Sequence, residues 1–287
     1  MRSAYTTPRG EQTTGSAGWK ALAVRVLLVG IIVASPGVAG TALADAGRFY
    51  LGVTGSPEWL DTSYKKTVDN TSPHNTTSQR GKVYRDRDAA DATGYGFGLL
   101  AGYRQPLLDR GRLFLSGEVD IAFHGESSRG RLAGVGESEG RNQIGESWPD
   151  TWSFAKNFSY GLTVKLGTNP HMLQKLLGDT DVYALAGVRR VSTRFRVRFH
   201  GCPMAEWCQP DEFISGTSTQ DETFTAWTSG AGLEKLFGSR LGLRGEVRYL
   251  GYLAEGRNFH NRRDGVFIPV RVNHDEVTLS LTLAWYF

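Results

Sequence analysis

The chain ends in Val277-Thr-Leu-Ser-Leu-Thr-Leu-Ala-Trp-Tyr-Phe287, a stretch that alternates apolar with polar or smaller residues to its last position. Successive side chains of an extended strand point to opposite faces, so this period of two predicts a β-strand with one apolar face. The apolar set comprises Val277, Leu279, Leu281, Leu283, Trp285 and Phe287.

The same alternation is clear in Gly94-Tyr-Gly-Phe-Gly-Leu-Leu-Ala-Gly-Tyr103, where large residues alternate with glycines. Six further runs follow the pattern with varying clarity: Gly47–Gly55, Leu113–His124, Phe158–Gly167, about Asp181–Val191, Thr223–Phe237 and Leu241–Tyr252. In the 181–191 run the phase stays open, because Tyr183 and Leu185 favour one face while Val182 and Val188 favour the other. The sequence therefore predicts about eight strands.

The connections between these runs alternate between short and long. Long ones are expected at about Ser56–Ala92, Gly125–Asn157, Ser192–Glu222 and Leu253–His274. In an up-and-down barrel this places all four long loops at one end and both chain termini at the other, which is typical of outer-membrane barrels. We expect an all-β fold, a closed antiparallel up-and-down transmembrane β-barrel.

Residues 1–44 have the composition of a signal peptide. Basic residues precede or enter the apolar segment Val26–Ala34, which is shorter than the ~20 residues that a membrane-spanning helix needs. Ala42-Leu43-Ala44 supplies small residues for cleavage, so the mature barrel domain is expected to be 45–287. The alternative is an uncleaved anchor helix.

Charge separates this chain from nucleic-acid-binding proteins. Residues 1–44 contain four basic residues and one acidic residue, which leaves 29 basic and 28 acidic residues in 45–287. The net charge of about +1 gives no electrostatic basis for binding nucleic acid.

The charges inside the predicted strands distinguish a membrane barrel from a soluble one. A lipocalin-type barrel would bury its apolar face, whereas here three acids and three bases share the polar faces, where opposite charges can pair. A barrel of about eight strands has room inside only for side chains, so an ionic network fits its interior and the apolar face must meet lipid. The expected interior network is Glu118, Asp120, Lys165, Arg244, Glu246 and Arg248.

The closing strand 278–287 resembles the terminal strand that the barrel-assembly machinery of outer membranes reads, with Trp285 and Phe287 as the assembly signal. Together with Gly94–Tyr103 and the loop pattern, it makes the region after residue 44 similar to the small eight-stranded barrels of the OmpA/OmpX and opacity-protein type. This resemblance implies export to the outer membrane of a Gram-negative-type bacterium, with lipid, lipopolysaccharide and the assembly machinery as partners.

Motifs for cofactor or metal binding are weak in this sequence. Cys202 and Cys208 are the two cysteines, and in an oxidising compartment they are expected to form a disulfide. Metal binding is the alternative, but two thiols and His200 fall short of a four-ligand zinc set. Gly94–Gly102 lies in a strand with no helix after it, which excludes a phosphate loop. We expect neither cofactor nor metal.

Two polar clusters allow functional hypotheses. His124 with Ser127 or Ser128 could serve a lipid A-modifying enzyme, although the spacing departs from the deacylase pattern and a turn-rich loop entry explains these residues equally well. Arg194, Arg196 and Arg198, together with Arg189 and Arg190, lie on an extension of the 181–191 run, above the expected edge of the membrane. They could hold lipopolysaccharide phosphates or belong to an ordinary solvated hairpin.

The function we expect is that of a non-enzymatic outer-membrane barrel whose loops serve surface contact, adhesion to a host or surface ligand, or envelope integrity. The alternatives are a narrow solute pore and a lipid A-modifying enzyme.

Overall fold

The computed structural model describes residues 47–107, 113–170, 178–204, 208–252, 255–261 and 264–287. The expected signal peptide lies outside these residues. Within these residues, nine strands and two short 3₁₀ turns follow in the order β1 (Arg48–Asp69), β2 (Val83–Pro106), β3 (Leu113–Leu132), η1 (Glu139–Arg141), β4 (Asp150–Thr168), β5 (Thr180–Gly201), η2 (Pro210–Glu212), β6 (Ile214–Phe237), β7 (Leu241–Tyr252), β8 (Glu255–Asn261) and β9 (Val266–Tyr286).

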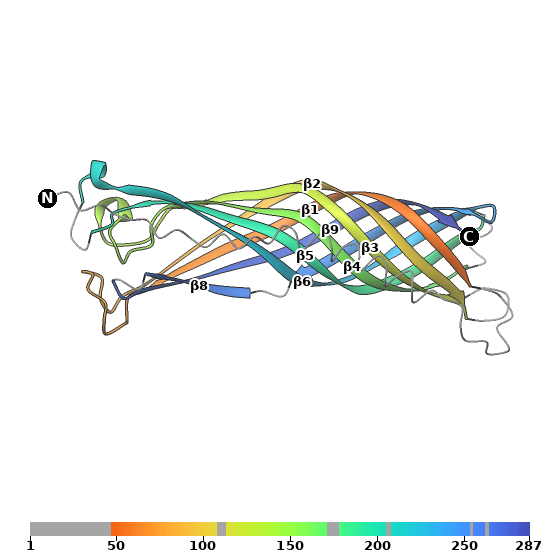
Figure 1. Ribbon diagram of the computed structural model, residues 1–287, viewed down its shortest axis with the longest axis horizontal. Coiled ribbons are helices and arrows are strands. Elements are labelled where there is room, and N and C mark those ends of the chain that lie inside the picture. The colour runs from red at the N-terminus through yellow and green to blue at the C-terminus, as the bar shows by residue number, and fades with distance from the viewer. Residues whose placement is uncertain (1–46, 108–112, 171–177, 205–207, 253–254, 262–263) are drawn as a thin grey trace, which may run out of the picture. The chain divides into compact units, whose positions relative to one another are not determined.

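Eight of these strands form a closed antiparallel ring. Each of β1 to β6 pairs with the next strand in sequence, β7 pairs with β9, and β9 pairs back with β1. The short strand β8 pairs with β9 outside the ring. The ring confirms the predicted eight-stranded up-and-down barrel, and its strands wind around one another in Figure 1.

The exterior of the ring carries an apolar belt. On β9 the outward side chains are apolar from Val277 to Phe287, and Leu281 is 60 % exposed; Tyr95 on β2 is 75 % exposed. A soluble barrel would not leave large apolar side chains exposed around its whole circumference, because each loses free energy in water. The belt faces lipid, and ring closure satisfies the backbone groups that lipid cannot hydrogen-bond.

The strands continue well beyond the belt, so the predicted long loops were wrong over most of their length. The β1–β2 ladder extends to Asp69 and Val83, and the β3–β4 ladder extends to Leu132 and Asp150. In this part the outward residues are polar and the inward ones are apolar, which is the reverse of the belt. A search for apolar outward faces therefore stops at the edge of the belt.

Above the belt the ring divides into two sheets. The β2–β3 ladder ends at Gly96 and His124, and the β6–β7 ladder ends at Ala226 and Tyr252. The upper halves of β1, β2 and β9 then stay together with β8, while those of β3 to β6 form the other group (Figure 1). We call this region the upper barrel.

A buried apolar core holds the two sheets of the upper barrel together. Its members come from both sheets: Tyr64, Leu132, Trp152, Phe154, Phe195, Val197, Phe224 and Val270. Where β2 and β3 no longer pair, Asp88 Oδ2 accepts hydrogen bonds from Arg131 N and Trp152 Nε1 at 2.7 and 2.8 Å. A carboxylate thus replaces part of the missing ladder.

The structure also resolves the phase of β5. Tyr183 and Leu185 point into the barrel and are buried, whereas Val188 is 55 % exposed on the outside. Phe114 packs with both inward residues, which explains why aromatic and aliphatic side chains occur on the inner face there.

Among the described residues, no helix is long and apolar enough to cross a bilayer.

The polarity of the belt gives a prediction for β6. Leu233→Arg is expected to lower the free energy of unfolding in liposomes by about 2–4 kcal/mol, because Leu233 faces lipid. Thr219→Arg, on the same strand and the same outer face but above the belt, is the matched control and is expected to change it by less than about 0.5 kcal/mol. Equal losses in urea titrations of the two variants would contradict this membrane placement.

Candidate functional site

An ionic network fills the lower part of the lumen, at the level of the belt. Lys165 Nζ lies 2.8 Å from Glu118 Oε2 and 2.6 Å from Glu246 Oε1, and Arg244 Nη1 lies 2.9 Å from Glu118 Oε2. Arg248 pairs with Glu246 and reaches Glu118 at 3.4 Å. Five of the six residues expected in the interior network are therefore connected directly.

This lower network is larger than the sequence indicated and is balanced in charge. Arg244 also pairs with Glu234 at 2.8 Å, and Arg104 pairs with Asp181 at 2.6 Å and with Glu234 at 3.6 Å. Four basic side chains thus face four carboxylates. Tyr50 and Tyr286 pack against Arg244 and complete the filling of the lumen.

The sixth expected residue, Asp120, has a partner outside the predicted network. It pairs with Arg189, whose side chain is only 11 % exposed. We placed Arg189 above the membrane with the outer arginines, and this was wrong: at odd positions the inner face of β5 carries Arg189, while Arg190 points outward. The uncertain phase of this strand caused the error.

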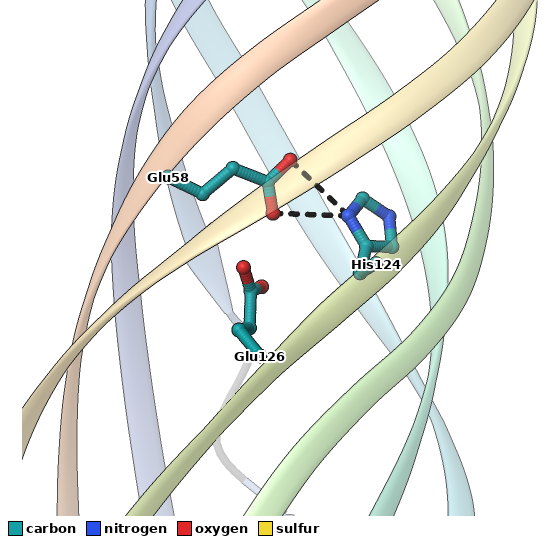
Figure 2. Close-up of side chains that lie close together, drawn as sticks. All are labelled: Glu58, His124 and Glu126. Atoms are coloured by element: carbon teal, nitrogen blue, oxygen red, sulfur yellow. Dashed lines mark hydrogen bonds and ion pairs between the residues drawn. The ribbon is translucent and has the colours of Figure 1, made fainter.

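A second charged cluster lies above the lower network, at the upper edge of the belt. Its centre is Lys156 on β4, whose Nζ lies 2.9 Å from Glu58 Oε2, 2.7 Å from Glu276 Oε2 and 3.3 Å from Glu126 Oε1. His124 Nδ1 lies 2.9 Å from Glu58 Oε2, as Figure 2 shows. We call Glu58, His124, Glu126, Lys156 and Glu276 the upper cluster.

Ser159, next to the upper cluster, forms a line with His124 and Glu58 that resembles the serine, histidine and acid of a hydrolase. His124 Nε2 lies 2.7 Å from Ser159 Oγ, and Nδ1 faces Glu58. Ser159 has no exposed surface, however, and lies inside the ladders with β3 and β5, which use its backbone groups. A nucleophile needs access for its substrate and free donors for the oxyanion. The predicted partner Ser128 instead bonds Thr62, 2.9 Å away.

The upper barrel contains a cavity of about 360 Å³ between its two sheets. Its walls are largely apolar and come mainly from β1, β4, β5 and β9, with the loop before β4. Lys66 and Asp150 form an ion pair of 2.6 Å in its wall. Burial lowers the pKa of Lys66 and raises that of Asp150, so each group depends on its partner to remain charged.

The other residues that the sequence analysis singled out lie on the outer face of the barrel or at its ends. Cys202 and Cys208 form a disulfide. Arg194 pairs with the exposed Asp221 at 2.7 Å, and Arg196 and Arg198 point outward in the upper barrel. Trp285 and Phe287 are exposed in the belt at 47 % and 71 %.

Sequence reasoning missed most of the upper cluster. Glu58, Glu126 and Lys156 fall in stretches that the sequence predicts as long loops, and Glu276 lies just before the closing run at Val277. A signal was present for Glu58 and Glu276, since both continue the inward phase of a predicted strand. Glu126 likewise continues the even-numbered inward positions of β3. On β4, by contrast, the inward positions change from odd to even at the β-bulge beside Lys156, so the alternation pattern could not place that residue.

No protein-family model and no curated protein matches this chain in sequence. Among solved structures, it is similar to the Neisserial surface protein A, at 14 % identity over 85 % of this chain and 100 % of that one, with a TM-score of 0.34. It is also similar to Ail, the attachment invasion locus protein of Yersinia pestis, at 13 % identity over 81 % and 99 %, with a TM-score of 0.26. A third is the outer membrane protein AlkL, at 13 % identity over 88 % and 96 %, with a TM-score of 0.34.

The architecture of the chain agrees with the resemblance seen in its sequence. Eight antiparallel strands close a ring that is apolar outside and charged inside at one level. Such barrels span the outer membranes of bacteria. The chain is a closed eight-stranded antiparallel β-barrel with the architecture of the small outer-membrane barrels.

The lower network gives a stability prediction. Lys165→Met is expected to lower the free energy of unfolding by about 3–5 kcal/mol, because it leaves the buried carboxylates Glu118 and Glu246 with one cation fewer. Lys82→Met is the control: it removes an ion pair with Glu137 whose side chains are 42 % and 65 % exposed, and should cost at most about 1 kcal/mol. Equal effects on the urea midpoint would show that the lower network does not stabilise the barrel.

Proposed function

We propose that this chain is a closed, non-enzymatic outer-membrane barrel that acts at the cell surface through its upper barrel. The observation that carries the proposal is the filled lumen at the level of the belt. Four cations and four carboxylates bridge strands on opposite sides of the ring there, so that a solute would have to break several buried ion pairs to pass.

The length of the upper barrel supports a role outside the membrane. A membrane-spanning strand needs about 9–11 residues, whereas β2 and β6 have 24 residues each. The surplus forms two sheets with their own core, which is a rigid support for the loops at its end. Rigid scaffolds with loops at one end are a common arrangement for binding.

The closed lumen predicts the outcome of conductance measurements. In planar bilayers, the inserted chain should give no stable single-channel openings, and the chain's shift in apparent mass on boiling in SDS should verify that it is folded. Openings whose size changes in Glu246→Gln or Arg248→Gln would instead support the narrow pore, because both residues belong to the lower network.

The outer face of the upper barrel carries an arginine surface. Across the β3–β4–β5 ladders, Arg129 and Arg196 lie on either side of Ser153, and Arg131 and Arg198 on either side of Thr151. We propose that these arginines contact phosphates of lipopolysaccharide, because guanidinium groups bind phosphate in a bidentate manner and this surface begins just above the belt. Arg194 contributes less, since Asp221 already holds it.

The lipid contact can be tested by co-purification. Arg194→Ser, Arg196→Ser and Arg198→Ser together should lower the lipopolysaccharide that remains with the detergent-extracted barrel several-fold. The matched control is Arg85→Ser, Arg87→Ser and Arg271→Ser, which removes three exposed arginines from the other sheet. Equal retention in the two triple variants would end the hypothesis of a specific surface.

A further inference from the structure

The upper cluster differs from the rest of the lumen in its charge balance. The lower network pairs four cations with four carboxylates, and Asp120 pairs with Arg189. In the upper cluster, by contrast, Lys156 is the single lysine among three carboxylates: Glu58, Glu126 and Glu276. With His124 and His274 neutral, the upper cluster keeps a net charge of −2. The nearby Arg189 does not balance this charge, because it already pairs with Asp120. Buried uncompensated charge is costly.

Glu126 is the carboxylate of the upper cluster with the fewest stabilising contacts. Its side chain has no exposed surface, and within the described part of the chain neither of its carboxylate oxygens accepts a hydrogen bond. Lys156 approaches it only to 3.3 Å while making shorter contacts with Glu58 and Glu276. Figure 2 shows the Glu126 carboxylate directed towards the space beside Glu58 and His124.

The backbone is shaped to bring these three side chains together across β2. Glu58 comes from β1, and His124 and Glu126 come from β3. Between them, β2 presents Gly94 and Gly96: a Cβ at Gly94 would lie 2.1 Å from the Glu126 Cβ, and one at Gly96 would lie 2.3 Å from Glu58 Oε1. Any side chain at these positions would fill the space that the carboxylates occupy.

A β-bulge completes the arrangement. The β3–β4 register shifts between Phe123 and Glu126, so that the bulge includes His124. Bulges redirect side chains and are common next to functional sites. Here the bulge lies at His124 and Glu126, which are two residues apart and share the inner face of β3.

We propose that Glu58, His124 and Glu126 bind a divalent transition-metal ion such as Zn²⁺. One ligand atom from each of the three lies within 4.8 Å of the other two. An imidazole with two carboxylates suits Zn²⁺ and its first-row neighbours better than Mg²⁺ or Ca²⁺, which prefer oxygen ligands alone. A charge of +2 would cancel the remaining charge of the upper cluster.

The neighbouring residues fit this role. Ser159 Oγ, 2.7 Å from His124 Nε2, can accept a hydrogen bond from Nε2–H, which leaves Nδ1 free to coordinate. Lys156 can stay with Glu276, its closest partner. The β2–β3 ladder ends at the Gly96–His124 pair, so no backbone hydrogen bonds join β2 and β3 above the site.

The test is zinc binding by the purified, untagged barrel in detergent. After treatment with EDTA, the chain is equilibrated with Zn²⁺ against a chromophoric chelator, and bound metal is counted by mass spectrometry. We expect one Zn²⁺ per chain and an affinity at least about tenfold lower in Glu126→Gln and in His124→Gln. His200→Gln is the control, because it removes an exposed histidine from β5 and should leave binding unchanged.

Two outcomes would overturn the proposal. The wild-type chain could retain no zinc, in which case protons rather than a metal ion balance the upper cluster. Alternatively, zinc binding could be lost in His200→Gln but kept in Glu126→Gln, which would locate it at the surface. The mass shift on boiling verifies that each variant is folded.

A measurement on the wild-type chain keeps the proposal testable even if the variants fail to fold. X-ray absorption at the zinc edge should show a first shell of nitrogen and oxygen at about 2.0–2.2 Å, with scattering from imidazole. A shell of oxygen alone, without scattering from imidazole, would exclude His124 as a ligand. A shell containing sulfur would also contradict the site, because none of its three proposed ligands contains sulfur.

Discussion

The structure depends on one constraint: hydrocarbon offers no hydrogen bonds to the peptide backbone. A sheet in lipid must therefore close on itself, and eight strands close around a lumen that only side chains fill. Closure also separates two environments at the level of the belt: lipid outside the ring and a narrow lumen inside it. The apolar residues of β9 and the charged residues Glu118, Lys165 and Arg244 are the two sides of this separation.

Above the belt the same strands meet water, so their outward residues are polar there and their inward residues are largely apolar. On β1 the outward residues change from Val53 and Trp59 to Asp61, while the inward ones change from Glu58 to Tyr64. The interior can now be apolar, so two sheets pack on a core as in a soluble protein. The upper cluster lies at the boundary, where the charged lumen ends and the apolar core begins; His274 next to it contacts Phe154, with ring centroids 4.8 Å apart.

This exchange explains what the sequence could predict. The belt strands, their number and the inward charges of β3, β4 and β7 follow from a period of two with an apolar outer face. The upper barrel does not, because its outer face is polar and its inner face mixes Phe195 with Thr193, so the pattern resembles a loop. The upper cluster was beyond prediction for a second reason: Glu58, Glu126 and Lys156 meet only through the β1–β2–β3–β4 register and its bulges.

The central claim is that each strand carries lipid-facing and lumen-facing residues in alternation up to a sharp level, where the outer face passes into water. A spin-label scan of β9 from Val270 to Trp285 in liposomes tests this most directly, by comparing collisions with oxygen and with a water-soluble nickel complex. The account predicts high oxygen accessibility at Val277, Leu279, Leu281 and Leu283, low accessibility to both reagents at Thr278, Ser280 and Thr282, and high nickel accessibility at Arg271. Equal accessibility of neighbouring residues, or nickel access at Ser280, would contradict it.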